Sequence, residues 1–263
     1  GAEAVIQGRT GRFAVVLERV LDSHNHSAVI RSAEAMGIQN IFIVNNLVER
    51  NETERAKTVV LAKKITKNCY KWLTIRNFDT TAECIEALRA DGYSIWATDL
   101  AREAVSLNDR AALLPVPPKV AVVIGRESDG VSREMLDVCD KRCFMPMYGF
   151  TESFNVSVAC ALFLQRLFDV CPEAHGDLPE EQKASLRREW FAELTKNATA
   201  KLACGAFLAE PERVTPLDDL RRPEGERESW APPKIKKREA AAVAALEGGA
   251  SKKPGSPDLA TGP

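Results

Sequence analysis

Short apolar runs alternate with amphipathic stretches along the first 170 residues of the chain. Runs of this length, rich in β-branched and aromatic residues, are typical of strands. They occur at residues 13–18, 41–44, 72–75, 93–98, 120–124 and 143–147. The run VAVVI at 120–124 contains no polar residue, and such a run is typical of a central strand in a parallel sheet, where both faces are buried.

Apolar residues recur at helical spacing between several of these strands. The run AVIRSAEAMG forms an apolar stripe, with Ser27 as the expected N-cap and Gly37 as its end. Further helices are expected at 80–90, 132–138 and after Asn155. Strands that alternate with helices in this way predict a single α/β domain with a parallel sheet.

Three polar loops, at residues 22–27, 125–130 and 148–155, follow predicted strands. Ligands of open α/β sheets bind at the carboxyl ends of strands, often at a helix N-terminus. The second loop contains neither GK[ST] nor GxGxxG, which disfavours the usual kinds of nucleotide phosphate site. From residue types alone, each loop is either a ligand site or an ordinary turn before a helix.

Few side chains near these loops indicate a particular chemistry. Arg31 is either a solvated arginine or a planar cation directed at a phosphate or carboxylate. His24 and His26 have a spacing compatible with a metal, but no third ligand lies near them in sequence, so we expect no metal site. The carboxylates of Glu18 and Glu127 show no pairing in sequence that demands acid–base catalysis.

Composition excludes several classes of protein. The 263 residues carry a formal net charge of −1, so any nucleic-acid contact must come from a local patch rather than from a global basic field. Seven scattered cysteines without a CxxC pair favour a reducing compartment and reduced core thiols. No apolar run has the length of a membrane span, and we expect no membrane association.

The pattern changes after residue 172. Residues 180–202 form a charged amphipathic segment, whereas proline, alanine, glycine and charged residues dominate from residue 210. We therefore expect a lead-in at 1–12, an α/β domain at 13–172, a helical extension at 173–208 and a disordered tail at 209–263. The cytoplasm is the expected compartment, with a plastid or mitochondrion as the alternative because the chain begins at Gly1 without Met.

Three segments resemble the motifs of one enzyme family. LERVLDSHNHSAVIRSAEAMGI (17–38), VVIGRESDGVSREML (122–136) and MPMYGFTESFNVSVACALFL (145–164) resemble motifs 1, 2 and 3 of the SpoU, or TrmH-like, RNA 2′-O-ribose methyltransferases. The resemblance implies the SPOUT fold, an α/β fold in which helices flank a parallel sheet and the C-terminal part forms a deep trefoil knot. Periodicity predicts the α/β part only.

The resemblance also implies S-adenosylmethionine as cofactor, held mostly by backbone atoms of the three loops. Matched motif by motif, the cofactor contacts are Thr98, Gly125, Arg126, Glu127, Gly130, Met145 and Phe154. His26 departs from the family, which usually has an aliphatic residue there.

The catalytic residues implied by the resemblance are Arg31 and Asn25 from motif 1, Glu127 from motif 2, and Ser153 and Asn155 from motif 3. Transfer of a methyl group to a ribose hydroxyl requires an aligned oxygen and removal of its proton. Arg31 is the family's proposed proton acceptor, but a guanidinium has a pKa above about 12. An electrostatic clamp on ribose and phosphate remains an equal alternative for it.

The expected substrate is tRNA, at guanosine 18 of the D-loop, because the helical extension is similar to that of the tRNA-modifying branch. Another tRNA position, rRNA, or a non-catalytic RNA-binding role are the alternatives. Family members are homodimers through the knot and the motif 3 helix. Candidate phosphate contacts are Arg187, Arg188, Lys196 and Lys201 on the extension, together with Lys63, Lys64 and Lys67.

Overall fold

The computed structural model describes residues 1–20, 22–45, 69–196 and 198–211. Lys63, Lys64, Lys67 and the part of the predicted tail beyond residue 211 lie outside these ranges. Within these ranges, no helix is both long enough and apolar enough to cross a membrane.

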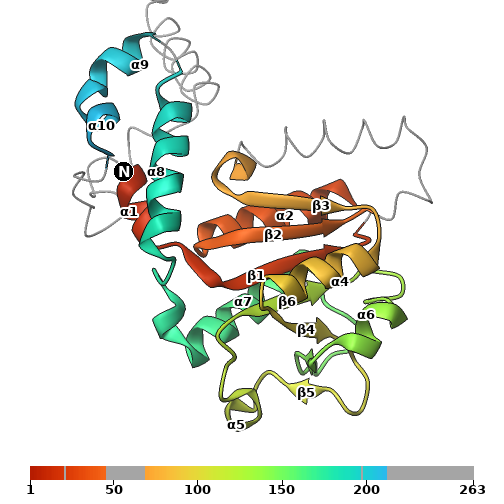
Figure 1. Cartoon of the computed structure of the whole chain (residues 1–263). Helices are drawn as coiled ribbons and strands as arrows, with labels where there is room; N and C mark the ends of the chain where they lie inside the picture. The colour runs from red at the N-terminus through yellow and green to blue at the C-terminus, as the bar shows by residue number, and fades with distance from the viewer. Residues whose placement is uncertain (21, 46–68, 197, 212–263) are drawn as a thin grey trace, which may run out of the picture. The chain divides into compact units, whose positions relative to one another are not determined.

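A seven-stranded parallel sheet forms the centre of the structure, in the order β3-β2-β1-β6-β4-β7-β5 (Figure 1). The strands are β1 (Thr10–Glu18), β2 (Ile38–Val44), β3 (Thr74–Phe78), β4 (Ser94–Thr98), β5 (Val105–Ser106), β6 (Val120–Ile124) and β7 (Lys141–Phe144). The α-helices are α1 (Ala2–Gln7), α2 (Ser23–Ala35), α4 (Thr81–Ala90), α5 (Arg110–Leu113), α6 (Arg133–Val138), α7 (Val156–Val170), α8 (Glu180–Leu194), α9 (Ala198–Ala203) and α10 (Gly205–Ala209).

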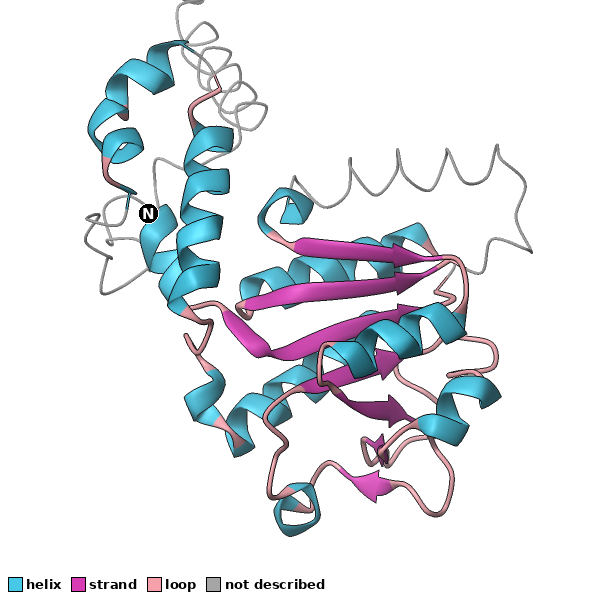
Figure 2. Cartoon of the chain, in the orientation of Figure 1, coloured by secondary structure: helices cyan, strands magenta, loops and turns pink. Residues whose placement is uncertain are grey.

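Helices cover both faces of the sheet (Figure 2). Alternate residues of a strand point to opposite faces, and β1 follows this rule. Phe13, Val15 and Leu17 pack with α2 and α7, whereas Ala14 and Val16 pack with α4 and α6. All five residues of β6 are buried, which explains its unbroken apolar sequence and confirms the prediction of a central parallel strand.

Strand and helix boundaries differ from the predictions where local signals are weak. β1 begins at Thr10 rather than at residue 13, and β7 ends at Phe144 rather than at Met147. β3 begins at Thr74 rather than at residue 72, because Trp72 ends the 3-10 turn Cys69–Trp72. The sequence did not predict the edge strand β5, which has only 2 residues, or the short helices α1 and α5.

The segment at residues 22–27 is the start of α2, not a loop. Asp22, rather than Ser27, is the N-cap, and its side chain accepts a hydrogen bond from the His24 amide at 2.9 Å. Polar residues in the first turn of a helix resemble a loop in sequence, because caps and turns favour the same residue types. Asn25 therefore lies on a helix rather than on a mobile connection.

The two ends of the described chain pack together through α1 and α8. Ile6 of α1 is buried with Leu186 and Trp190 of α8. Glu3 and Arg187 form a buried ion pair beside this contact, with 2.7 Å between Oε1 and Nη2. Burial alone would raise the pKa of Glu3, but the hydrogen bonds from Arg187 and Gln7 bring this pKa below its ordinary value.

Arg187 is therefore not a phosphate contact, and the prediction for this residue was wrong. Its side chain is only 7% exposed and its guanidinium is bonded to Glu3. Lys196 pairs with Glu193 on the surface, and Arg188 is exposed. The amphipathic pattern of α8 did not distinguish Arg187 from Arg188, because only the partner helix α1 decides which of the two is covered.

Replacing Arg187 with Met should destabilise the protein by about 3–5 kcal/mol, since it leaves the Glu3 carboxylate buried without its cation. Replacing the neighbouring, exposed Arg188 with Met should change stability by about 0.5 kcal/mol or less. Urea unfolding of the two variants measures both values. Equal losses would show that the ion pair contributes nothing specific.

Candidate active site

The polar segments predicted as loops lie at the carboxyl edge of the sheet, around the boundary between β1 and β6. These strands are neighbours, yet the chain continues from β1 toward β2 on one side, whereas β6 is followed by β7 on the other. Such a reversal of strand order is where open α/β sheets bind ligands. The chain beyond β1 enters α2, and the chain beyond β6 enters residues 125–130.

A chain of hydrogen bonds joins Asn155, Asn25 and Glu127. The side-chain amide of Asn155 donates to Asn25 Oδ1 at 2.8 Å, and the amide of Asn25 donates to Glu127 Oε1. The first of these bonds spans 130 residues of sequence and the second spans 102. One polar side chain from each of the three predicted segments thus meets the others at a single place.

Asn155 is also the N-cap of α7. Its Oδ1 accepts hydrogen bonds from the Ser157 amide at 3.0 Å and from the Ser157 hydroxyl at 2.6 Å. The sequence allows either Ser153 or Asn155 to cap this helix, and the structure has Asn155 as the cap. Because its oxygen is engaged by α7, its amide group is oriented toward Asn25.

Residues 125–130 form a tight turn that requires glycine at both ends. Arg126 and Gly130 exchange backbone hydrogen bonds of 2.9 and 3.2 Å. A Cβ atom on Gly125 would lie 2.0 Å from the carbonyl carbon of Gly130, and Gly130 itself has a φ of +69°. The collision at Gly125 and the positive φ at Gly130 therefore both favour glycine.

Arg126 and Asp129 of this turn form an ion pair, whereas the Glu127 carboxylate accepts a hydrogen bond from the neutral Asn25 amide. Asp129 accepts hydrogen bonds from Arg126 and from Arg19, which follows β1. These contacts, with that from Arg126 first, hold the pKa of Asp129 well below its usual range. Arg19 also approaches the Gly130 carbonyl oxygen at 3.5 Å, so the end of β1 anchors the turn after β6.

Glu18 has a structural role that its sequence position did not reveal. Its carboxylate is fully buried at the end of β1. It accepts hydrogen bonds from the Ser132 amide at 2.7 Å and from the Thr81 hydroxyl at 2.9 Å. Ser132 caps α6 and Thr81 begins α4, so this carboxylate ties two helix N-termini to the central strand.

The remaining predicted cofactor contacts flank this place. Thr98 ends β4, donates to the Val123 carbonyl at 3.1 Å, and lies next to β7 through its pairing with Cys143. Met145 follows β7 and packs partly against the core between the sheet and α2 and α7. Ser153 and Phe154 precede α7 and are exposed, Phe154 by 38%.

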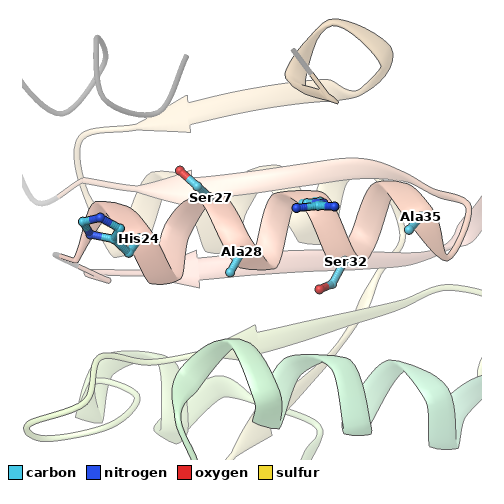
Figure 3. Close-up of a pocket in the computed structure, with 6 residues that line it drawn as sticks. His24, Ser27, Ala28, Ser32 and Ala35 are labelled. Atoms are coloured by element: carbon cyan, nitrogen blue, oxygen red, sulfur yellow. The ribbon is translucent and has the colours of Figure 1, made fainter. Parts of the chain in front are cut away.

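Arg31 lies on a different side of α2 from Asn25. Six residues at 3.6 residues per turn separate the two side chains by about 120°. Arg31 is exposed and lines a cavity of about 430 Å³ along α2. The cavity's other lining residues are His24, Ser27, Ala28, Ser32 and Ala35 (Figure 3). Within one chain, the structure thus brings Asn25, Glu127 and Asn155 together. Arg31 of the same chain is not part of this group.

The described residues include no cluster of three or more His, Cys, Asp or Glu side chains that could hold a metal ion. His24 is exposed and His26 is buried. The thiols of Cys84, Cys143 and Cys160 lie in the core, where burial raises the pKa of each to about 12. These cysteines are therefore unreactive core residues, as the sequence predicted.

Comparisons with known proteins identify related chains. The model of the SpoU rRNA Methylase family matches residues 12–165. The tRNA (guanosine(18)-2′-O)-methyltransferase of Borreliella burgdorferi is 31% identical over 197 residues, which cover 74% of this chain and 84% of the relative. The enzyme of the same name from Aquifex aeolicus is 28% identical over 193 residues, covering 72% and 86%.

The fold is also similar to that of a solved relative. The crystal structure of the A. aeolicus TrmH/SpoU tRNA modifying enzyme superposes with a TM-score of 0.60 at 26% identity, covering 73% of this chain and 94% of that one. The family-model match at residues 12–165 includes all three motifs.

Replacing Asn155 with Ala should lower stability by about 1 kcal/mol, because the N-cap of α7 is lost. Replacing it with Ser should lower stability by only about a few tenths of a kcal/mol, because serine keeps an oxygen that caps α7. Serine cannot reach Asn25 as a donor, so this variant loses the contact with Asn25 but keeps the cap. Thermal unfolding of the two variants measures the difference. If both variants lost the same stability, the capping bond would be unimportant.

Proposed function

Because the chain belongs to the SpoU rRNA methylase family, we propose that it transfers a methyl group from S-adenosylmethionine to a ribose 2′-hydroxyl of tRNA, at guanosine 18. The observation that carries this proposal is the convergence of Asn25, Glu127 and Asn155 at the carboxyl edge of the sheet. Two relatives that align with 74% and 72% of this chain are named tRNA (guanosine(18)-2′-O)-methyltransferases.

The residues at this edge fit the cofactor. When bound, S-adenosylmethionine supplies an electrophilic methyl group on a sulfonium sulfur. The turn at 125–130 presents backbone amides and carbonyls. Gly125 lies so close to the backbone of Gly130 that there is no room for a Cβ atom. Thr98, Gly125, Arg126, Glu127, Gly130, Met145 and Phe154 would hold the cofactor. Arg126 pairs with Asp129 within this turn, and the exposed Glu127 carboxylate accepts a hydrogen bond from Asn25.

The side chains around the hydrogen-bonded asparagines would hold the ribose. Asn25 and Asn155 keep each other's amides in fixed orientations, and Glu127 fixes the Asn25 amide in turn. Ser153, exposed before α7, is available as a hydroxyl donor to the sugar. Fixed polar groups of this kind align the 2′-oxygen for in-line attack.

Arg31 would act on the ribose or its phosphate from a second subunit. Its guanidinium makes no hydrogen bond or ion pair with any residue that the structure describes, and it lies on a side of α2 away from Asn25. A homodimer through α7 is the arrangement that we propose. Val158 and Leu162 on this helix are 46% and 37% exposed although they are apolar, and a second copy would cover them.

We also infer that the C-terminal part of the domain forms the trefoil knot of the family. β6 and β7 lie on opposite sides of β4, so the connection at 125–140 crosses β4, and the connection at 99–119 includes β5 on the far side of β7. Arg166 of α7 donates to the carbonyl oxygen of Leu107 at 2.7 Å, which holds α7 against the connection at 99–119. These contacts support the crossing that the knot requires.

Mapping of 2′-O-methyl groups tests the substrate. The protein is incubated with unmodified tRNA or with rRNA and methyl-labelled S-adenosylmethionine. Label at guanosine 18 of tRNA is expected. Label confined to rRNA would overturn the choice of substrate, and no label with no cofactor binding in calorimetry would overturn the enzyme assignment.

Replacing Gly125 with Ala should abolish binding of S-adenosylmethionine, because the added methyl group collides with the Gly130 backbone. Gly149 is the control. A Cβ there meets only the Thr151 hydroxyl at 4.0 Å, so its replacement with Ala should leave the fold intact. Isothermal titration calorimetry measures binding in both variants. Wild-type affinity in the Gly125→Ala variant would exclude the turn as a cofactor site.

Replacing Arg31 with Ala should lower kcat by about 100-fold or more, whether Arg31 takes the proton or clamps the charge. Arg31→Lys separates the two roles, since lysine keeps the charge: substantial retained activity indicates a clamp. Arg133→Ala is the control, because Arg133 is exposed on α6 and, in the part of the chain that the structure describes, pairs with Asp137. Full activity of Arg31→Ala would remove Arg31 from the mechanism.

A further inference from the structure

Arg9 is a fully buried arginine outside the three motifs, at the junction of α1 and β1. Its Nη2 atom donates to Glu34 Oε1 at 2.6 Å, and its Nη1 atom donates to the carbonyl oxygens of Glu34 and Ile38 at 3.1 and 3.0 Å. Its guanidinium also lies 5.1 Å from the centroid of the Trp190 ring of α8. A buried cation with this many partners is held in one place.

Glu34 is the helical neighbour of Arg31. Residues three apart on a helix face the same side, and an arginine and a glutamate at this spacing ordinarily pair. Arg31 makes no such pair with the residues that the structure describes. Instead, Arg9 binds the Glu34 carboxylate through its Oε1 atom.

A third group shows that these charges share one neighbourhood. Cys69 lies close enough to feel Glu34, Arg31 and Arg9 electrostatically. Burial first, and the Glu34 carboxylate second, raise the pKa of its thiol, whereas Arg31 and Arg9 oppose the increase. Glu34 and Arg31 are therefore near enough to interact. They do not pair in this structure because the Glu34 carboxylate is bound by Arg9.

We propose that Arg9 is a positioning residue for Arg31: it binds the Glu34 carboxylate and so keeps the Arg31 guanidinium free for the RNA. This inference rests on the proposed role of Arg31 in methyl transfer. Glu34 is 20% exposed and Arg9 is 0% exposed in their ion pair. The shielded cation therefore competes for the carboxylate more strongly than the solvated Arg31 does.

The position of Arg9 also connects the site to the helical extension. Trp190 covers the guanidinium from α8. Of the two backbone acceptors, Glu34 lies in the last turn of α2 and Ile38 begins β2. A cation at the C-terminal end of a helix is stabilised by the helix dipole. Removal of Arg9 would thus leave the Glu34 carboxylate unbound. It would also break the contact that Arg9 makes between α8 and α2, the helix that carries Asn25 and Arg31.

The test compares the full chain with Arg9→Met and with Arg9→Met/Glu34→Gln in the tRNA methylation assay. Arg9→Met frees the carboxylate to pair with Arg31, so kcat/KM for tRNA should fall about two- to five-fold, the size expected of an exposed helical ion pair. The double variant removes that carboxylate and should return kcat/KM to near the wild-type value, although it restores none of the hydrogen bonds of Arg9.

The rescue separates positioning from mere structural support. A structural role predicts that the double variant is no more active than Arg9→Met, and this result would overturn the inference, as would an unchanged kcat/KM in Arg9→Met. If Arg9→Met does not fold, Arg9→Lys and Arg9→Lys/Glu34→Gln replace the pair. Lysine keeps the cation, so Arg9→Lys should retain activity, and a fall in its kcat/KM that Glu34→Gln does not reverse would overturn the inference.

Wild-type activity in the same assay distinguishes failure of the proposed function from failure of the proposed role of Arg9. No methylation by the wild-type chain contradicts the proposed function itself. Methylation by the wild type with no difference among the variants contradicts only the role of Arg9.

Discussion

The packing of α7 against α2 beneath the sheet is the contact on which the candidate site depends. Both helices bury apolar side chains against the same face of β1 and β6, Val29 and Ile30 from α2 and Cys160 and Leu164 from α7. Because the two helices lie side by side, the Asn25 in the first turn of one meets the Asn155 that caps the other. Burial supplies the free energy for the contact, and the hydrogen bond adds its orientation.

Charged residues divide into two groups with different tasks. Arg9 and Arg187 are buried and bonded to carboxylates, and they join α1, α2 and α8 into one unit. Arg31 and Arg188 are exposed. The two buried arginines are therefore unavailable to a phosphate group, whereas the two exposed arginines remain accessible to one.

Much of the architecture was predictable because burial on both faces leaves an unbroken apolar strand, and β6 has such a sequence. The segments at Asn25, Gly125 and Asn155 were predictable as places of interest through their motifs. Their mutual contact was not predictable from periodicity, since a period says which face a residue occupies but not which distant segment covers it. The two-residue β5 and the six-residue α1 are too short to give any periodic signal.

The sequence by itself determined the alternation of strands and helices, the family motifs and the glycines that close the turn at 125–130, because these follow from local backbone and side-chain chemistry. Only the tertiary structure decided that Arg187 packs the extension while Arg188 remains exposed, that Glu18 anchors two helices, and that Glu34 is bound by Arg9 rather than by Arg31. Each of these outcomes depends on which distant partner removes water from the charge, and that partner is brought near only by the fold.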